Sequence, residues 1–140
     1  MTTAVDTNVI VALWDKNKLL SSAAESALER ALAFGGLVLS APVVAELMAA
    51  PGRSEAFINA FLLDTGIHVD WDLGKEIWRT AGRAFQKYAS RRRSSSVDGP
   101  RRILADFLIG AHAIEADYPL LTLDTRLYRA AFPRLRLIEI

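Results

Sequence analysis

The chain of 140 residues contains no cysteine, so disulfide bonds, thiolate zinc sites and cysteine nucleophiles are excluded. A reducing cytoplasm is therefore the expected compartment. Only two histidines occur, His68 in a β-type run and His112 in a helical pattern, and both positions are typical of packing or surface residues. The chain also lacks a Gly-rich phosphate loop with its lysine. We therefore expect neither a Ser/His/Asp triad nor a P-loop nucleotide site.

Long hydrophobic runs are missing as well. No uncharged apolar run approaches the ~18 residues of a membrane helix, and the N-terminus reaches Asp6 without a basic region. We therefore expect neither a membrane span nor a signal peptide. A length of 140 residues is that of one domain, so we assign residues 1–140 to a single domain.

An excess of charge of either sign is also absent, since 17 basic and 16 acidic residues give a formal net charge of +1. Hydrophobic residues make up 51% of the chain, against an average of ~45–50% for a set that also counts glycine. A small domain of this composition has more apolar surface than it can easily hide. We therefore expect the chain to form a homodimer through an apolar helical face.

Four carboxylates stand within or directly after apolar stretches, where an ordinary fold places no charge: Asp6, Glu46, Asp106 and Asp124. Burying a carboxylate costs several kcal/mol unless it is paired, hydrogen-bonded or bound to a cation. No lysine or arginine lies within three residues of the first three. Oxygen ligands from four parts of the chain suit a hard ion, so they predict a Mg²⁺ or Mn²⁺ site.

Short β-type runs alternate with longer helical patterns. The strand candidates are Thr2–Val5, Leu37–Ser40, Ile67–Val69, Leu120–Leu123 and Leu135–Ile138. The helix candidates are Val9–Trp14, Ser22–Ala33, Pro42–Ala49, Glu55–Leu63, Asp72–Ala89, Arg102–Ala116 and Thr125–Ala131. This alternation predicts an α/β fold with a mostly parallel sheet covered by helices on both faces.

Ligands of such sheets bind beyond the carboxyl ends of the strands, and the four acids are placed to meet there. Asp6 and Asp124 end the first and fourth strand candidates, while Glu46 and Asp106 lie near the starts of two helices. Each acid also has a structural alternative, as a helix cap, a partner of the helix dipole or a solvent-facing residue. The apolar surroundings of Asp106 and Glu46 favour burial, and with it the metal site.

Four motifs follow one another along nearly the whole chain. They are Val5-Asp6-Thr7-Asn8-Val9, Pro42-Val43-Val44-Ala45-Glu46-Leu47, Ala105-Asp106-Phe107-Leu108-Ile109-Gly110-Ala111-His112-Ala113 and Thr122-Leu123-Asp124-Thr125-Arg126-Leu127-Tyr128. In order and spacing they resemble the motifs of PIN-domain ribonucleases, most of all the VapC toxins of toxin–antitoxin pairs. Each motif alone is weak, whereas the four in order are specific. Tyr128 stands where many relatives have Phe, which we expect to be a packing position.

The resemblance implies a compact three-layer α/β/α PIN-like fold and metal-dependent hydrolysis of single-stranded or loop RNA. Asp6, Glu46, Asp106 and Asp124 match the family's acidic positions, which hold Mg²⁺ or Mn²⁺, and Asn8 and Thr122 match its polar accessory positions. It also implies an antitoxin protein as partner. A PIN nuclease of RNA maturation or decay without an antitoxin is an alternative. A catalytically inactive nucleic-acid-binding module is another, although the complete acid set argues against it.

A run of basic and small residues, Ser90–Arg102, precedes the third motif and is longer than expected for the family. We expect it to form a mobile loop. Its arginines are planar donors that match phosphate groups and are candidates for holding the RNA backbone: Arg91, Arg92, Arg93, Arg101 and Arg102. A merely solvated loop is an equally open interpretation, because charge runs are usually solvated.

Overall fold

The computed structural model describes residues 1–94 and 101–140, in which five strands form one sheet in the order β3-β2-β1-β4-β5. The strands are β1 (Thr3–Val5), β2 (Leu37–Ser40), β3 (His68–Asp70), β4 (Leu120–Thr122) and β5 (Leu137–Glu139). Each of the four neighbouring pairs is parallel, with Ala4 of β1 opposite both Val38 and Leu120. The parallel sheet predicted from the alternation of strands and helices is confirmed.

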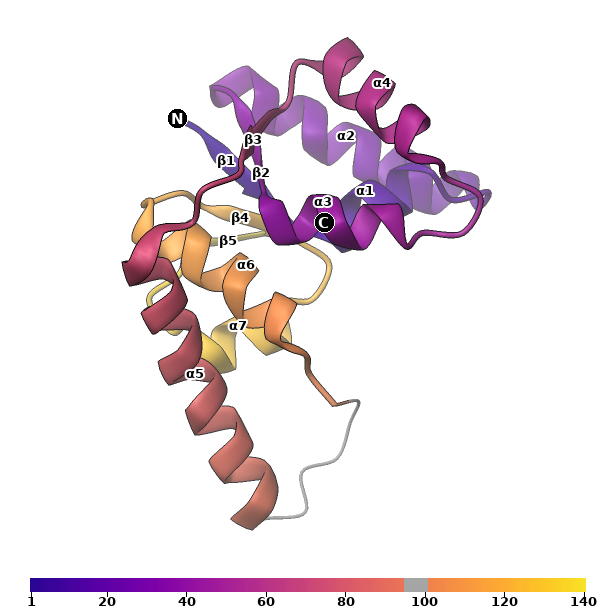
Figure 1. The fold of residues 1–140 in the computed structure, drawn as a ribbon. Coiled ribbons are helices and arrows are strands. Elements are labelled where there is room, and N and C mark those ends of the chain that lie inside the picture. Colours follow the sequence, from indigo (N-terminus) through magenta and orange to yellow (C-terminus); the bar gives the residue numbers. More distant parts are fainter. Residues whose placement is uncertain (95–100) are drawn as a thin grey trace.

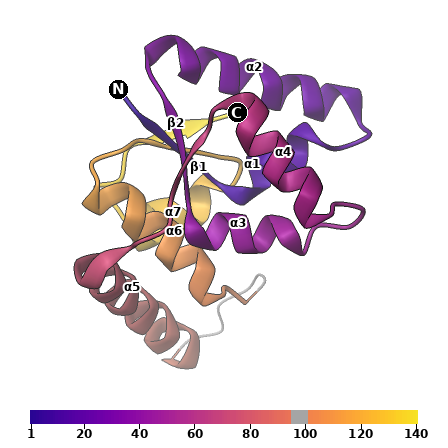
Figure 2. The same ribbon diagram turned by 45° about the horizontal axis from the view of Figure 1, so that its top comes forward.

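Helices cover both faces of this sheet (Figures 1 and 2). The described residues contain α1 (Thr7–Leu13), α2 (Lys18–Phe34), α3 (Ala41–Met48), α4 (Glu55–Thr65), α5 (Gly74–Ser94), α6 (Leu104–Glu115) and α7 (Thr125–Ala131). Helices α2 and α4 lie on one side, and α5, α6 and α7 lie on the other, which confirms the three-layer α/β/α fold. In the part of the chain that the structure describes, no helix is long and apolar enough to span a membrane.

The centre of the core is formed by the three central strands and α6, and the other helices pack apolar residues against them. Strands β1, β2 and β4 are buried along their whole length, whereas the edge strands β3 and β5 are more exposed. Every residue of α6 from 107 to 113 is buried. This confirms that the helix carrying Asp106 is buried on nearly every side, and it places the start of that helix at the carboxyl edge of the sheet.

Helix boundaries differ from the predicted ones where capping groups decide them. Helix α2 begins at Lys18 because the Asn17 side chain accepts hydrogen bonds from the amides of Leu19 and Leu20. Helix α6 begins only at Leu104, since the amide of Ile103 donates to the Asp106 carboxylate. Both signals were present in the sequence but compete with other polar residues nearby.

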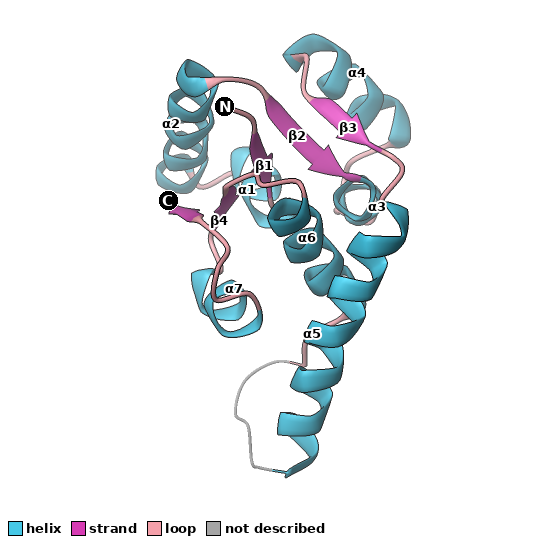
Figure 3. Cartoon of the chain, turned by 90° about the vertical axis from the view of Figure 1, so that its left-hand side faces the viewer, coloured by secondary structure: helices cyan, strands magenta, loops and turns pink. Residues whose placement is uncertain are grey.

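The predicted loop over Ser90–Arg102 is wrong in its first part. Helix α5 continues to Ser94, so Arg91, Arg92 and Arg93 form its last turn, and its C-terminal half extends beyond the sheet (Figure 3). Arginine is a good helix former, and basic residues are favourable at the C-terminal end of a helix dipole. Arg101 and Arg102 do lie outside helices, whereas residues 95–100 are outside the described part of the chain.

A close contact between α6 and the segment after α7 disfavours any side chain at position 110. A Cβ atom at Gly110 would lie 2.3 Å from Cε2 of Phe132, a residue that is only 4% exposed, so the Phe132 ring would have to shift. Overpacking therefore outweighs the ~1 kcal/mol that alanine offers over glycine in a helix. Gly82 on the exposed side of α5 has no neighbour within 4 Å of such an atom.

We predict that Gly110→Ala lowers the free energy of unfolding by about 1–3 kcal/mol. Gly82→Ala is the matched control and should raise it by about 0.5–1 kcal/mol, because it gains helix propensity without a clash. Urea denaturation of both variants measures the difference. Equal stability of the two variants would show that the Phe132 ring yields.

Candidate active site

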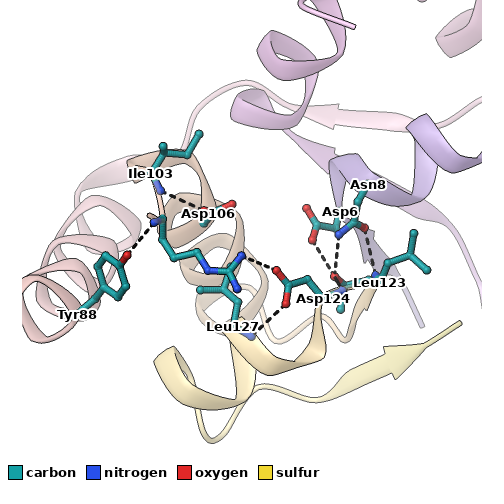
Figure 4. A network of polar contacts seen from close by, with 10 residues as sticks. Asp6, Asn8, Tyr88, Ile103, Asp106, Leu123, Asp124 and Leu127 are labelled. Atoms are coloured by element: carbon teal, nitrogen blue, oxygen red, sulfur yellow. Dashed lines mark hydrogen bonds and ion pairs between the residues drawn. The ribbon is translucent and has the colours of Figure 1, made fainter. Parts of the chain in front are cut away.

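The six residues predicted for the site come from two strand–helix junctions and two further helices at the carboxyl edge of the sheet. Figure 4 labels four of them, Asp6, Asn8, Asp106 and Asp124. Asp6 and Asn8 lie at the junction of β1 and α1, and Thr122 and Asp124 at the junction of β4 and α7. Glu46 and Asp106 lie in α3 and in the first turn of α6. Only Asp6 is fully buried, whereas the other three acids are partly buried. The burial expected for Asp106 and Glu46 is therefore partial, because Asp106 lies in the first turn of its helix and Glu46 on a partly exposed helix.

Asp6 is the most constrained of the four acids. One carboxylate oxygen caps α1 by accepting from the amide of Thr7 at 2.8 Å, and the other accepts from the Thr122 hydroxyl at 2.8 Å. Burial raises the pKa of Asp6 from 3.8 to about 6; these hydrogen bonds offset part of the rise, and the charge of Asp106 adds to it. The capping alternative is therefore correct for Asp6, but a cap alone does not require a buried carboxylate.

Thr122 and Asn8 connect the ends of β1 and β4. The Thr122 hydroxyl, which is fully buried, donates to Asp6 and accepts from the amide of Asp124 at 2.9 Å. The Asn8 side-chain oxygen accepts from the amide of Leu123 at 3.1 Å, and its nitrogen is 3.5 Å from the Thr122 hydroxyl. Thr122 therefore contacts both Asp6 and Asp124 directly, whereas Asn8 contacts Thr122 and the backbone of Leu123.

Glu46 is held by a residue that the sequence analysis did not single out. The hydroxyl of Thr7, the residue after Asp6, donates to a Glu46 carboxylate oxygen at 2.6 Å. This contact ties α3 to the start of α1, and these two helices also pack against each other. The position of Thr7 beside Asp6 in the first motif was the one available signal.

Asp106 and Asp124 both accept hydrogen bonds from backbone amides. Asp106 accepts from the amide of Ile103 at 3.1 Å, and Asp124 caps α7 through the amide of Leu127 at 3.3 Å. The second oxygen of Asp124 lies 2.7 Å from Nη1 of Arg102. Burial raises the pKa of Asp106, while the Ile103 hydrogen bond and the Arg102 charge hold it down and the Asp124 charge raises it.

Tyr128 contributes a hydroxyl to this acidic region, although its ring packs in the core as expected. The side chain is fully buried, and among the described residues its hydroxyl has no hydrogen-bond partner of regular geometry. Its closeness to the Asp6 carboxylate lowers the pKa of Asp6. Burial, followed by the charges of Asp6, Asp106 and Glu46, raises the pKa of Tyr128. The Tyr128 hydroxyl thus lies beside the Asp6 carboxylate, in the field of three acids.

The donor set fits Mg²⁺ or Mn²⁺ by its chemistry, because it consists of carboxylate oxygens with nearby hydroxyls. As the side chains stand, no three acids or histidines in the described residues converge closely enough to ligate one ion. Three of the acids are held by other groups of the chain. Glu46 accepts from the Thr7 hydroxyl, Asp106 accepts from the Ile103 amide, and Asp124 pairs with the Arg102 guanidinium. An ion held by these acids would have to displace some of these contacts.

The two histidines lie outside this cluster. His112 is buried and pairs with Asp70 at 2.8 Å, and His68 pairs with the other oxygen of Asp70 at 3.0 Å. The pair links α6 to β3. These contacts agree with the interpretation of both histidines as packing or surface residues.

The raised pKa of Asp6 leads to a prediction about stability without metal. The folded chain binds the Asp6 proton more tightly than the unfolded chain, whose pKa is near 3.8, so this group destabilises the fold increasingly as pH rises from about 4 through 6. Asp6→Asn removes this penalty. In chelator, the variant should gain on the order of 1–3 kcal/mol over the wild type between pH 4 and 7.5.

Urea denaturation across that pH range measures the difference. Asp64→Asn, on the exposed side of α4, is the control and should differ from the wild type by a constant amount. A constant difference for Asp6→Asn as well would contradict the raised pKa.

Comparison with known proteins identifies a matching family and several solved structures of similar fold. The family model of the PIN domain matches residues 3–133. Comparison with curated proteins gave no match. Among solved structures, the fold is similar to VapBC2 from Rickettsia felis bound to a promoter DNA fragment, with a TM-score of 0.71, 21% identity and coverage of 99% of this chain and 98% of that chain. VapBC-1 from nontypeable Haemophilus influenzae gives a TM-score of 0.69 and 23% identity, with coverage of 99% and 98%.

FitAcB from Neisseria gonorrhoeae gives a TM-score of 0.60 and 21% identity, covering 99% of this chain and 97% of that chain. At these identities the likeness to solved structures establishes the fold alone. The family match, in contrast, extends over most of the sequence and includes all four acids. The chain belongs to the PIN domain family.

Proposed function

We propose that this chain is a metal-dependent endoribonuclease that hydrolyses single-stranded or loop RNA, and that this single domain is the toxin of a toxin–antitoxin pair. The observation that supports this most is the buried Asp6 at the carboxyl edge of a parallel sheet, with Glu46, Asp106 and Asp124 on the elements around it. PIN domains are nucleases. The complete set of acids argues against an inactive binding module.

The site residues divide into ligands and positioning groups. Asp6, Glu46, Asp106 and Asp124 would hold Mg²⁺ or Mn²⁺, which when bound neutralises charge on the phosphate and lowers the pKa of water. Thr122 and Asn8 hold the acids at the ends of β1 and β4 in place. Burial of Asp6 and Tyr128 excludes water from the inner side of the site, which strengthens the interactions of the carboxylates with a cation.

An antitoxin is the partner that the structural relatives support. Two of the similar solved structures are VapBC2 and VapBC-1. A third, from Klebsiella pneumoniae, is described as a toxin-antitoxin complex and has 18% identity and a TM-score of 0.63. We propose that this chain likewise has a cognate antitoxin. A PIN nuclease of RNA maturation would have none, so co-purification of the protein encoded next to this chain separates the two.

The basic residues outline a path for the RNA backbone. Arg92 at the end of α5 donates to the Tyr88 hydroxyl at 3.2 Å, and the amide of Arg102 donates to the same hydroxyl at 2.8 Å. Arg102 in turn reaches Asp124. The last turn of α5, with Arg91 and Arg93, therefore adjoins the acids through Tyr88. We propose that these arginines, together with Arg101, contact RNA phosphates.

We also propose that the active form is a homodimer. An apolar groove between α3 and α6 is lined by Pro42, Ala45, Glu46, Ala49, Ile103, Leu104, Ala105 and Leu108. Beside it, the side chains of Met48, Ile103 and Leu104 are 47%, 55% and 41% exposed. Covering this surface with the same surface of a second chain would bury it and would place two sets of acids near one another.

Replacing any one of the four acids by its amide should reduce RNA cleavage by about a hundredfold or more. Asp6→Asn, Glu46→Gln, Asp106→Asn and Asp124→Asn keep side-chain volume but remove the charge that holds an ion. Single-turnover cleavage of a labelled RNA in Mg²⁺ or Mn²⁺ is the measurement, with circular dichroism to verify folding. Because the acids act as a unit, a double variant should lose little more than a single one.

Asp64→Asn makes the same chemical change at an exposed position and should cleave at the wild-type rate. Wild-type rates in two of the four site variants would refute the assignment of the acids.

The dimer should be visible as twice the 15.4 kDa mass of the chain in light scattering at micromolar concentration. Leu104→Gln places a polar group in the α3–α6 groove and should shift the equilibrium toward monomer by at least tenfold, roughly the cost of failing to bury one leucine. Leu63→Gln is the control, since Leu63 is 82% exposed on α4 across the sheet. A monomeric wild type would disprove the dimer, and equal effects of both variants would disprove this face.

A further inference from the structure

One cation of the chain already occupies the acid cluster. Nη1 of Arg102 lies 2.7 Å from an oxygen of Asp124, and the two side chains are only 23% and 31% exposed. Because the other Asp124 oxygen accepts from the amide of Leu127, both of its oxygens are engaged by protein donors. A metal ion at Asp124 would therefore compete with the guanidinium charge and with the Leu127 amide (Figure 4).

Two successive backbone amides, those of Arg102 and Ile103, are held by hydrogen bonds to side chains. The Arg102 amide donates to the Tyr88 hydroxyl at 2.8 Å, and the next amide, that of Ile103, donates to Asp106 at 3.1 Å. The Tyr88 ring packs against Phe107 of the core with centroids 5.5 Å apart. The backbone of Arg102 is thus held in place near the acids. Its side chain remains partly exposed and can change its rotamer.

We propose that Arg102 is the internal counter-cation of the acid cluster: a divalent ion displaces its guanidinium from Asp124, and the freed guanidinium then binds a phosphate of the RNA. This inference rests on the proposed metal-dependent function. It makes Arg102 a positioning residue for Asp124 in the metal-free chain and a substrate contact in the loaded one.

The chemistry of arginine favours exchange over the alternatives. A guanidinium keeps its charge at any physiological pH, so it can leave Asp124 only by competition and not by deprotonation. A charged pair that is about one quarter to one third exposed is weaker than a buried one, so a divalent ion can replace it. The planar donors released in this way match phosphate in two-point contacts, next to where the acids would hold the ion.

Calorimetric titration with Mn²⁺ tests the exchange without relying on activity. Arg102→Gln should bind Mn²⁺ roughly three- to tenfold more tightly than the wild type, because the ion no longer has to displace the guanidinium. Arg101→Gln is the matched control, since it removes the same charge from the neighbouring exposed residue, and should change the affinity by about twofold or less. An affinity of Arg102→Gln equal to or weaker than that of the wild type would overturn the proposal.

A double-mutant cycle separates direct exchange from the general repulsion between two cations. In an Asp124→Asn background the three remaining acids should bind Mn²⁺ more weakly, and Arg102 has lost its charged partner, so Arg102→Gln should no longer tighten this weaker Mn²⁺ binding. The same tightening in both backgrounds would overturn the exchange and leave the metal site intact. An absence of Mn²⁺ binding in both the wild type and Arg102→Gln would instead overturn the metal site itself, and the proposed function with it.

RNA cleavage kinetics and the salt dependence of RNA binding test whether the freed guanidinium contacts RNA. With saturating Mn²⁺, Arg102→Gln should raise the KM for a short single-stranded RNA about tenfold while kcat changes less. The slope of log affinity against log salt should fall by about 0.7, the loss of one phosphate contact. Arg102→Lys, which retains a point charge without the planar fork, should recover the salt slope. An unchanged KM and slope in Arg102→Gln would show that the freed guanidinium does not contact RNA.

Discussion

The hydrogen bond from the Thr122 hydroxyl to the buried carboxylate of Asp6 is the interaction on which the site depends. It joins the carboxyl ends of β1 and β4, which are neighbours because β1 lies at the centre of the sheet. The same hydroxyl accepts the amide of Asp124, so one side chain positions two acids from opposite ends of the sequence. Parallel strands expose their carboxyl ends at one edge, and the helices that begin there add Glu46 and Asp106.

Most of the fold follows from short-range signals. Runs such as Leu37–Ser40, bounded by Gly35-Gly36 and Pro42, predict strands correctly because their residues are buried on both faces of a parallel sheet. Strand ends are less predictable, since pairing decides them: Ile67 precedes β3 because the register with β2 begins at Val38 opposite His68. The extension of α5 to Ser94 was missed because a run of arginines was interpreted by its charge and not by its helix propensity.

The chemical character of the site was predictable, but its present arrangement was not. The order of four acidic motifs indicates which residues share an edge, and the structure has Asp6, Asn8, Thr122 and Asp124 in one network. Contacts such as Thr7 with Glu46 and Arg102 with Asp124 depend on rotamers and on residues 22 or 39 positions away in the sequence. Nothing in a single sequence ranks such pairs against the many other donors present.

Each of the four neighbouring acids is stabilised in a different way. Asp6 has a raised pKa, and Glu46 accepts a hydrogen bond from the Thr7 hydroxyl. Asp106 accepts one from the amide of Ile103, and Asp124 pairs with the guanidinium of Arg102. Three of the acids are only partly buried, so an ion could compete for these contacts. The affinity for an ion would then be the difference between what the ion gains and what these donors lose. The internal donors would therefore tune any metal binding by the acids. A chain with the same four acids and no such donors would bind the ion more tightly but would be less stable without it, which is the stability–function trade-off expected of an acidic site.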